Sequence, residues 1–147
     1  SEIELNSFIT ETLDILQTIP VAAGKNLNFS ANITPLNILA DRDKLKQVLI
    51  NLITNACEAV STGEAISISI HKSEDRRIYI QIHNGGTPIP ADILPQLTKP
   101  FFTTKASGTG LGLAIVKRIV EAHDGELGIE SSEGVGSIVT VQLPLML

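Results

Sequence analysis

The stretch that decides the fold is DRDKLKQVLINLITNACEAV at residues 41–60, which predicts a helix over 42–60. Its apolar residues recur every three or four positions and form one stripe, as expected of a helix that packs on a core. The stripe consists of Leu45, Val48, Leu49, Leu52, Ile53, Ala56 and Val60. Asp41 or Asp43 can cap the start of this helix, because a carboxylate accepts the N–H groups that the first turn leaves unpaired.

The opposite face of this helix is polar, with Lys44, Gln47, Asn51, Asn55 and Glu58 at spacings of three and four. Asparagine is a mediocre helix former, so the pair Asn51 and Asn55 favours a bound ligand over the alternative of a merely solvated face. An amide oxygen is a hard, neutral ligand that suits Mg²⁺, which makes Asn55 a candidate metal ligand. No Cys/His cluster or carboxylate cage in the sequence points to zinc or calcium instead.

Downstream of this helix, two pairs of segments alternate apolar and polar residues and predict β-hairpins. AISISIHK at 65–72 and RRIYIQIHN at 76–84 form the first pair. ELGIESS at 126–132 and GSIVTVQLP at 136–144 form the second, around a Glu133-Gly134 turn. Upstream, strands are predicted at 27–33 and 36–40, and these two could pair with each other.

Two further helices are predicted at 7–19, where Pro20 ends the run, and at 111–123, where Gly125 follows the end. In the second of these, Ile115, Ile119 and Ala122 share one side, with Val116 and Val120 beside them. ADILPQL at 91–97 is a short helical candidate. Strands grouped between helices predict an α+β fold: a two-layer sandwich with about three helices on one face of a mixed, mostly antiparallel sheet of about five strands.

A glycine-rich segment, GTGLGLAI at 108–115, opens the last helix. The unpaired N–H groups and the dipole of a helix N-terminus attract anions, and glycines let a phosphate approach the backbone. This signal is weak by itself, and its spacing is neither the dinucleotide GxGxxG nor a P-loop. PFFTTK, just upstream, supplies Lys105, a cation that can reach phosphates.

Composition restricts the class of protein. The 147 residues suit a single domain over 1–147, and 43% hydrophobic residues are too many for a disordered chain. A net charge of −5 argues against nucleic acid as a partner. Cys57 is the sole cysteine, so a reducing, cytoplasmic setting with a buried structural thiol is expected. No apolar run is long enough to cross a membrane, and we expect no direct membrane contact by this domain, which leaves a membrane-anchored parent protein open.

Four segments in order resemble the N, G1, F and G2 boxes of sensor histidine kinases, within the GHKL or Bergerat-fold ATPase superfamily. They are DRDKLKQVLINLITNACEAV, HNGGTPIP, PFFTTK and GTGLGLAIVKRIVEAHDG, and GVGSIVTVQLP is similar to the closing hairpin. The resemblance covers nearly the whole chain. It implies a Bergerat-fold α/β sandwich that binds ATP, with Mg²⁺, between the N-box helix and a flexible lid.

The resemblance also implies roles for individual residues. Asn55 matches the Mg²⁺-ligating asparagine, Asn51 lies one turn earlier near the phosphates, and Lys105 matches the F-box lysine; Asn51 and Lys105 are the residues implied in catalysis. The nucleotide-binding residues implied are Asn51, Asn55, Asn84, Gly86, Ile89, Lys105, Gly108, Thr109, Gly110, Leu111 and Gly112.

The chain departs from the family pattern at four positions. Asn84 stands where an adenine-reading aspartate is usual, if the segment is aligned on Ile89 and Pro90; shifted by one residue, His83 would take that place. Pro88 replaces the second G1 glycine. Glu58 and Lys99 reverse the charge that many relatives carry at those positions.

The family function implied is transfer of the ATP γ-phosphate to a histidine on a dimerisation and phosphotransfer domain of the same or a partner chain, with a response regulator downstream. His71, His83 and His123 do not lie in such a segment, so this domain by itself is expected to bind ATP or ADP without autophosphorylating. Related ATPases carry a glutamate at the position of Asn51, and an amide cannot take its proton, so hydrolysis is expected to be poor. A degenerate, nucleotide-binding regulatory module is the alternative.

Overall fold

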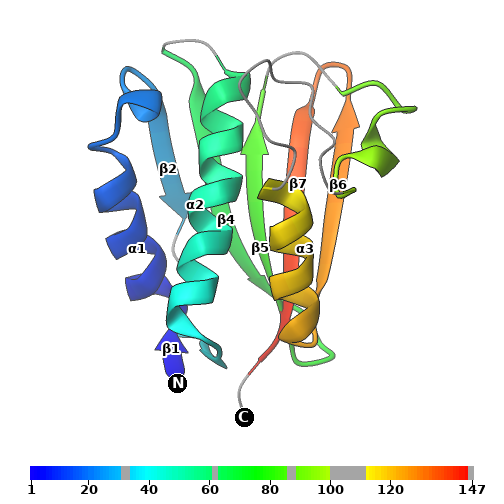
Figure 1. Cartoon of the computed structure of the whole chain (residues 1–147). Helices are drawn as coiled ribbons and strands as arrows, with labels where there is room; N and C mark the ends of the chain where they lie inside the picture. The colour runs from blue at the N-terminus through cyan, green and yellow to red at the C-terminus, as the bar shows by residue number, and fades with distance from the viewer. Residues whose placement is uncertain (31–33, 61–62, 86–88, 100–111, 146–147) are drawn as a thin grey trace.

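The computed structural model describes residues 1–30, 34–60, 63–85, 89–99 and 112–145. These residues form two layers: a twisted sheet, and three α-helices that all cover the same face of it (Figure 1). The helices are α1 (Leu5–Leu16), α2 (Arg42–Ala59) and α3 (Gly112–Ala122). The predicted two-layer α+β sandwich is confirmed.

The main sheet has five strands in the order β2-β4-β5-β7-β6. Their bounds are β2 (Asn26–Ser30), β4 (Ala65–Lys72), β5 (Arg77–Asn84), β6 (Glu126–Ser132) and β7 (Gly136–Pro144). β2 and β4 are parallel and every other neighbouring pair is antiparallel, so the sheet is mixed as expected. Both predicted hairpins are present, and the second turns at Gly134, whose φ of 82° suits glycine.

The core lies between the sheet and the helices and is mainly aliphatic. Alternate residues of β4 and β5 point at the helices and are buried, among them Ile66, Ile68, Ile80 and Ile82. The apolar stripe predicted for α2 is buried along its whole length, and Asp41 caps the helix by accepting the Lys44 N–H at 3.1 Å. Of the two predicted caps, Asp41 is therefore the one used.

The pairing expected between the strands at 27–33 and 36–40 is wrong. β2 instead pairs with β4, while β3 (Asn37–Leu39) pairs with β1 (Glu2–Glu4) in a separate two-stranded sheet. β1 was not predicted, because three residues are too few to show a period. The first helix begins two residues before the predicted start and ends three before the predicted end, and the remainder of the 7–19 run leads into a 3₁₀ turn at Pro20–Ala22.

Two smaller predictions also need correction. The helix expected at 91–97 is reduced to a 3₁₀ turn, Leu94–Gln96. In α3 the buried side is Ala114, Val116 and Val120, whereas Ile115 and Ile119 are half-buried and Ala122 is exposed.

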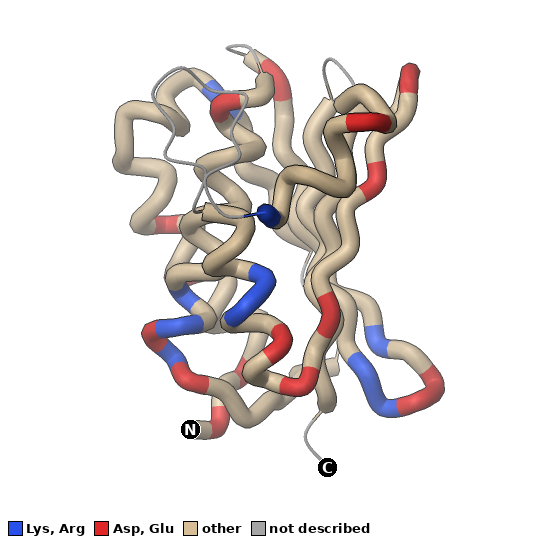
Figure 2. Tube along the Cα trace, turned by 45° about the vertical axis from the view of Figure 1, so that its right-hand side comes forward, with Lys and Arg blue, Asp and Glu red and all other residues tan. Residues whose placement is uncertain are grey.

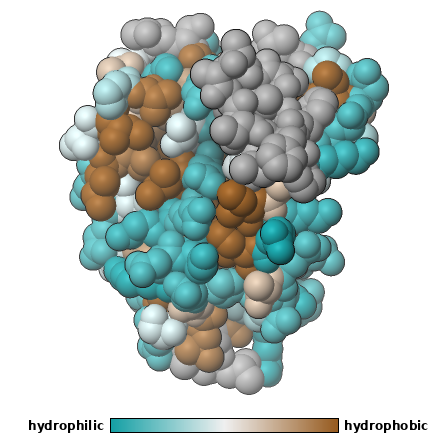
Figure 3. Space-filling view, viewed as in Figure 1, coloured by the Kyte–Doolittle hydropathy of each residue, from teal (hydrophilic) through white to brown (hydrophobic). Residues whose placement is uncertain are grey.

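On the helical face, Figure 3 shows hydrophobic residues over α1 and a second group of them over α3.

The C-terminus of α3 closes with a Schellman motif. Gly125 N–H donates to the Val120 carbonyl at 3.0 Å and Asp124 N–H to the Glu121 carbonyl at 3.1 Å. The left-handed residue is Asp124, with a φ of 60°, rather than Gly125. Gly125 is needed for a different reason: a Cβ there would collide with the Gln142 carbonyl oxygen of β7.

Candidate functional site

The two asparagines of α2, Asn51 and Asn55, are half-buried, and α2 packs against α3. α2 and α3 pack side by side and run in opposite directions, so the C-terminal half of α2, with Asn51 and Asn55, lies beside the N-terminus of α3 (Figure 1). Within the described part of the chain the Asn51 amide has no hydrogen-bond partner. No fully buried side-chain N or O atom of the described residues lacks a partner, so the Asn51 amide is open to solvent.

Asn84, the last residue of β5, reaches the same end of the molecule. The chain leaves α2 there and enters β4, whose Ile66 is paired with Asn84. Asn84 continues the helix-facing row of β5 and is 6% exposed. His83 faces the other side of the sheet, where its Nε2 lies 2.5 Å from the Val135 carbonyl. Asn84, not His83, therefore faces the helical layer.

The Asn84 amide is oriented by the backbone: its Nδ2 donates to the Gly85 carbonyl at 2.8 Å. This contact turns Oδ1 away from Gly85 and leaves it as the acceptor of the side chain. A single hydrogen bond thus sets which atom Asn84 offers to a neighbouring group.

Ile89 is held by residues that the sequence did not single out. Its N–H donates to Ser131 Oγ at 2.7 Å, and Ser131 Oγ lies 3.1 Å from Ser137 Oγ. Ser137 is buried and pairs directly with Asn84 across β5 and β7. Ser131 and Ser137 therefore connect the segment around Ile89 to the strand that carries Asn84.

Gly136 allows β7 to approach the end of β5. Its φ is 90°, and a Cβ at this position would run into the Asn84 carbonyl oxygen and come within 2.7 Å of Gly85 Cα. Gly112, at the start of α3, is half-buried and has open space where a Cβ would be. The predicted residues Gly86, Lys105, Gly108, Thr109, Gly110 and Leu111 lie outside the described residues.

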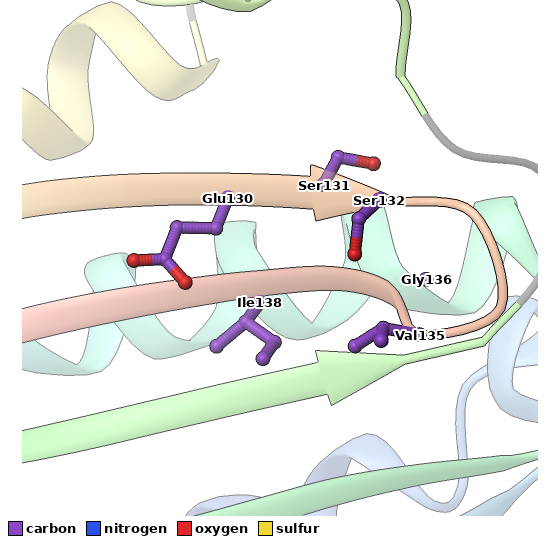
Figure 4. A pocket seen from close by; sticks show the side chains of 6 residues that line it. All are labelled: Glu130, Ser131, Ser132, Val135, Gly136 and Ile138. Carbon is purple, nitrogen blue, oxygen red and sulfur yellow. The ribbon is translucent and has the colours of Figure 1, made fainter.

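A hollow of about 190 Å³ opens elsewhere, at the tip of the β6–β7 hairpin, lined by Glu130, Ser131, Ser132, Val135, Gly136 and Ile138. Figure 4 shows that Glu130 and Ser132 point to one side of β6 and Ser131 to the other. Glu130 and Ile138 are paired on the sheet face away from the helices. This hollow is separate from the asparagines of α2.

Cys57 is buried in the core, 1% exposed, as expected of a structural thiol. Desolvation raises the pKa of this thiol; Lys25 acts in the opposite direction and Glu58 adds to the increase.

Because the folded state holds the thiol proton more tightly, Cys57 stabilises the fold below pH 9.0, the ordinary pKa of the thiol, and this contribution is lost as pH rises above it. We expect the free energy of unfolding of the wild type to fall more steeply above that pH than that of Cys57→Ala. Urea titrations of the two proteins across this range measure the difference. If the free energies of unfolding of the two proteins depend on pH in the same way, the pKa of the Cys57 thiol is not raised in the folded state.

Two features are absent from the part of the chain that the structure describes. The described residues hold no group of three or more His, Cys, Asp or Glu side chains placed to share a metal ion. No helix among them is both long and apolar enough to cross a membrane.

The family model for histidine kinase-, DNA gyrase B- and HSP90-like ATPases matches residues 40–147. The chain belongs to this ATPase family. The sensor histidine kinase ZraS of Salmonella typhimurium is 40% identical over 144 residues, which are 98% of this chain and 31% of ZraS. Sporulation kinase C of Bacillus subtilis is 39% identical over 145 residues, which are 97% of this chain and 33% of that kinase.

Solved structures agree with this assignment. The catalytic domain of histidine kinase ThkA has a TM-score of 0.87 and 32% identity, covering 98% of this chain and 94% of that domain. ThkA in complex with the response regulator protein TrrA matches with a TM-score of 0.84 and 30% identity, covering 99% of this chain and 42% of that one. The chain is thus a histidine kinase catalytic domain, as its four motifs implied, and it spans about a third of the length of the curated relatives.

Proposed function

We propose that this domain binds Mg-ATP between α2 and the segment leading into α3, and presents the γ-phosphate to a histidine on a separate helical domain. The observation that carries the proposal is the half-buried pair Asn51 and Asn55 on the C-terminal half of α2, the half that lies beside the N-terminus of α3. That N-terminus provides N–H groups and a favourable dipole for phosphates. Gly108, Thr109, Gly110, Leu111, Gly112 and Lys105 are the proposed phosphate contacts from this segment.

Asn55 is the proposed Mg²⁺ ligand. Mg²⁺ keeps several waters and takes one or two protein oxygens together with substrate phosphates. A lone amide oxygen fits that demand, and the described residues offer no cluster of acidic or histidine ligands that would compete for the metal. The ion supplies charge neutralisation on the phosphates when bound.

Asn51 is proposed to position the phosphates without activating water. An amide cannot accept a proton as a carboxylate does, so the site orients the γ-phosphate while leaving the attack to an external nucleophile. Water should be a poor nucleophile here, and slow ATP hydrolysis is expected. Rapid, Mg²⁺-dependent hydrolysis by this domain would contradict this role of Asn51.

Adenine selectivity is proposed to reside in Asn84, with Ile89 as the apolar neighbour of the base. The Gly85 carbonyl holds the Asn84 amide so that Oδ1 is the free acceptor. An acceptor suits the amino group of adenine and opposes the carbonyl of guanine at the same place.

We therefore expect ATP to bind about 5- to 150-fold more tightly than GTP, since an unmatched buried acceptor costs about 1–3 kcal/mol. Asn84→Asp should bind ATP more tightly than the wild type, because a charge-assisted bond replaces a neutral one. Calorimetric titration with both nucleotides measures this. Equal affinity of the wild type for ATP and GTP would contradict the role of Asn84.

The acceptor histidine is proposed to lie on another domain. His71 contacts Ser69 on the outer face of the sheet, His83 faces the same side, and His123 is engaged at the end of α3. The response regulator is proposed to act one step downstream. Cytoplasmic location of this domain remains a prediction from the sequence.

The test of this function is phosphate transfer to a supplied acceptor. The domain is incubated with labelled ATP and Mg²⁺, alone and with a purified dimerisation and phosphotransfer domain of its parent protein. Label should enter the acceptor and not this domain. Nucleotide binding without any transfer would overturn the kinase assignment in favour of a regulatory module.

A further inference from the structure

The cap of α2 involves, besides the Asp41 side chain, the ring of His123, the residue that follows α3. In a capping box the N-cap residue binds the N–H of the third helical residue, and a Glu or Gln at that third position accepts the N-cap N–H in return. Here the N-cap is Asp41 and the third position is Lys44, which has no acceptor. The N–H of Asp41 donates instead to His123 Nε2, at 3.0 Å.

The two contacts of the His123 ring fix its protonation. Nε2 accepts an N–H and so carries no proton, whereas Nδ1 lies 2.8 Å from the Ile119 carbonyl, to which only an N–H can donate. Both bonds exist together only in the neutral Nδ1–H tautomer. A proton on Nε2 would face the Asp41 N–H, and two donors cannot form a hydrogen bond with each other.

The bridge joins the ends of α2 and α3 that lie away from the proposed nucleotide site. Because the two helices run in opposite directions, Asp41 and His123 lie at one end, and Asn55 and Gly112 lie at the other (Figure 1). The α3 end is itself anchored, by its Schellman motif and by Arg77 Nη1, which donates to the Asp124 carbonyl at 2.7 Å. His123 therefore links the start of α2 to the end of α3, which is itself anchored to the sheet.

The segments that the bridge joins carry charged residues of both signs. Figure 2 shows acidic and basic residues of the two helices gathered at this end of the helical layer. The start of α2 carries Asp41, Arg42, Asp43 and Lys44, and the second half of α3 and the residues after it carry Lys117, Arg118, Glu121 and Asp124. His123 is half-buried, and its two hydrogen bonds make the contact with α2 and with α3.

We propose that His123 is a positioning residue: as a neutral Nδ1–H imidazole it completes the cap of α2 and holds α2 against α3 in the spacing that the nucleotide requires. The part of this proposal that concerns nucleotide rests on the proposed function. The bridge itself rests only on the two hydrogen bonds.

The protonation state is tested first. Nitrogen-15 shifts of the His123 ring in the wild-type domain at neutral pH should show a protonated Nδ1 and an unprotonated Nε2. A charged ring, or the opposite tautomer, would overturn the bridge. This measurement needs no nucleotide, so it holds whether or not the domain binds ATP.

Three variants then separate capping from positioning. His123→Asn ends at the position of Nδ1 and cannot reach Asp41, whereas the Gln in His123→Gln is long enough to accept its N–H. In the double variant His123→Asn/Lys44→Glu, the new Glu restores a capping box within α2 but no contact between helices. Thermal unfolding and Mg-ATP titration are measured on each.

His123→Asn should lower Tm by about 3–5 °C and weaken Mg-ATP binding about three- to fivefold, the effect of one net hydrogen bond. His123→Gln should stay close to the wild type. The double variant should regain Tm and not affinity. Wild-type affinity in His123→Asn, or affinity regained by the double variant, would overturn the positioning role.

If His123→Asn fails to fold, the bridge is tested by His123→Gln, which must then fold and bind Mg-ATP as the wild type does. If the wild type itself does not bind Mg-ATP, the proposed function and the positioning role both fall, and the tautomer result still decides the bridge.

Discussion

Asn55→Ala is expected to weaken Mg²⁺-dependent ATP binding by about 100-fold or more. Loss of residues that merely support a metal ligand costs roughly 10–100-fold in metal affinity, and Asn55 is proposed as a direct ligand. Asn55 lies on the half-buried face of α2, so the truncation removes little apolar contact and should leave the fold intact. Calorimetric titration with ATP, with and without Mg²⁺, measures the loss.

Two matched variants distinguish the metal contact from a general effect on α2. Asn55→Asp keeps a hard oxygen and should retain Mg²⁺-dependent binding. Lys44→Ala changes an exposed residue of the same helix and should bind as the wild type does. If Asn55→Ala loses affinity equally with and without Mg²⁺, Asn55 contacts the nucleotide rather than the metal.

Gly136→Ala is expected to destabilise the domain by about 3 kcal/mol or more. At a φ of 90° an L-residue is strained, which costs about 1–3 kcal/mol, and the added Cβ would also strike the backbone of Asn84 and Gly85. The Asn84 carbonyl oxygen and the Gly85 Cα both belong to the backbone, so β7 would have to move away from β5 to relieve the clash. Urea unfolding measures the change, and nucleotide affinity should fall with it because Asn84 is displaced.

Gly134→Ala is the matched control. Gly134 has a similar φ of 82° in the turn just before Gly136, but nothing lies within 4 Å of where its Cβ would be. Gly134→Ala should lower the free energy of unfolding only by the backbone strain, about 1–2 kcal/mol. Equal destabilisation by the two substitutions would show that the close approach to β5 adds nothing.

The elements that sequence predicted well are those whose signal is local. The period of α2, the alternation of β4 and β5 and the Gly134 turn are each contained in one segment, and each was confirmed. The partner of β2 was not predictable in this way. Its pairing with β4 forms only after α2 has brought the chain back to the edge of the sheet where β2 lies. β1 was missed for a different reason, because three residues are too few to show a period.

The candidate site likewise has a part that a local sequence pattern predicts and a part that depends on contacts between distant residues. The face of α2 that carries Asn51 and Asn55 was predicted from helical spacing alone. Ser131 and Ser137 were missed because their contacts with Ile89 and each other depend on strand register, and serines at a hairpin end carry no special signal. His123 was recognised only as a residue at a helix end, since its partner Asp41 is 82 positions away in the sequence.

The central claim is that the asparagine face of α2, the end of β5 and the start of α3 together bind one nucleotide. The most direct test is to map backbone amide NMR shifts of the domain during titration with Mg-ATP. The amides of Asn51, Asn55, Asn84 and Gly112 should shift together and saturate at one concentration. Shifts confined to Glu130, Ser132, Val135 and Ile138, around the hollow at the β6–β7 tip, would contradict the account.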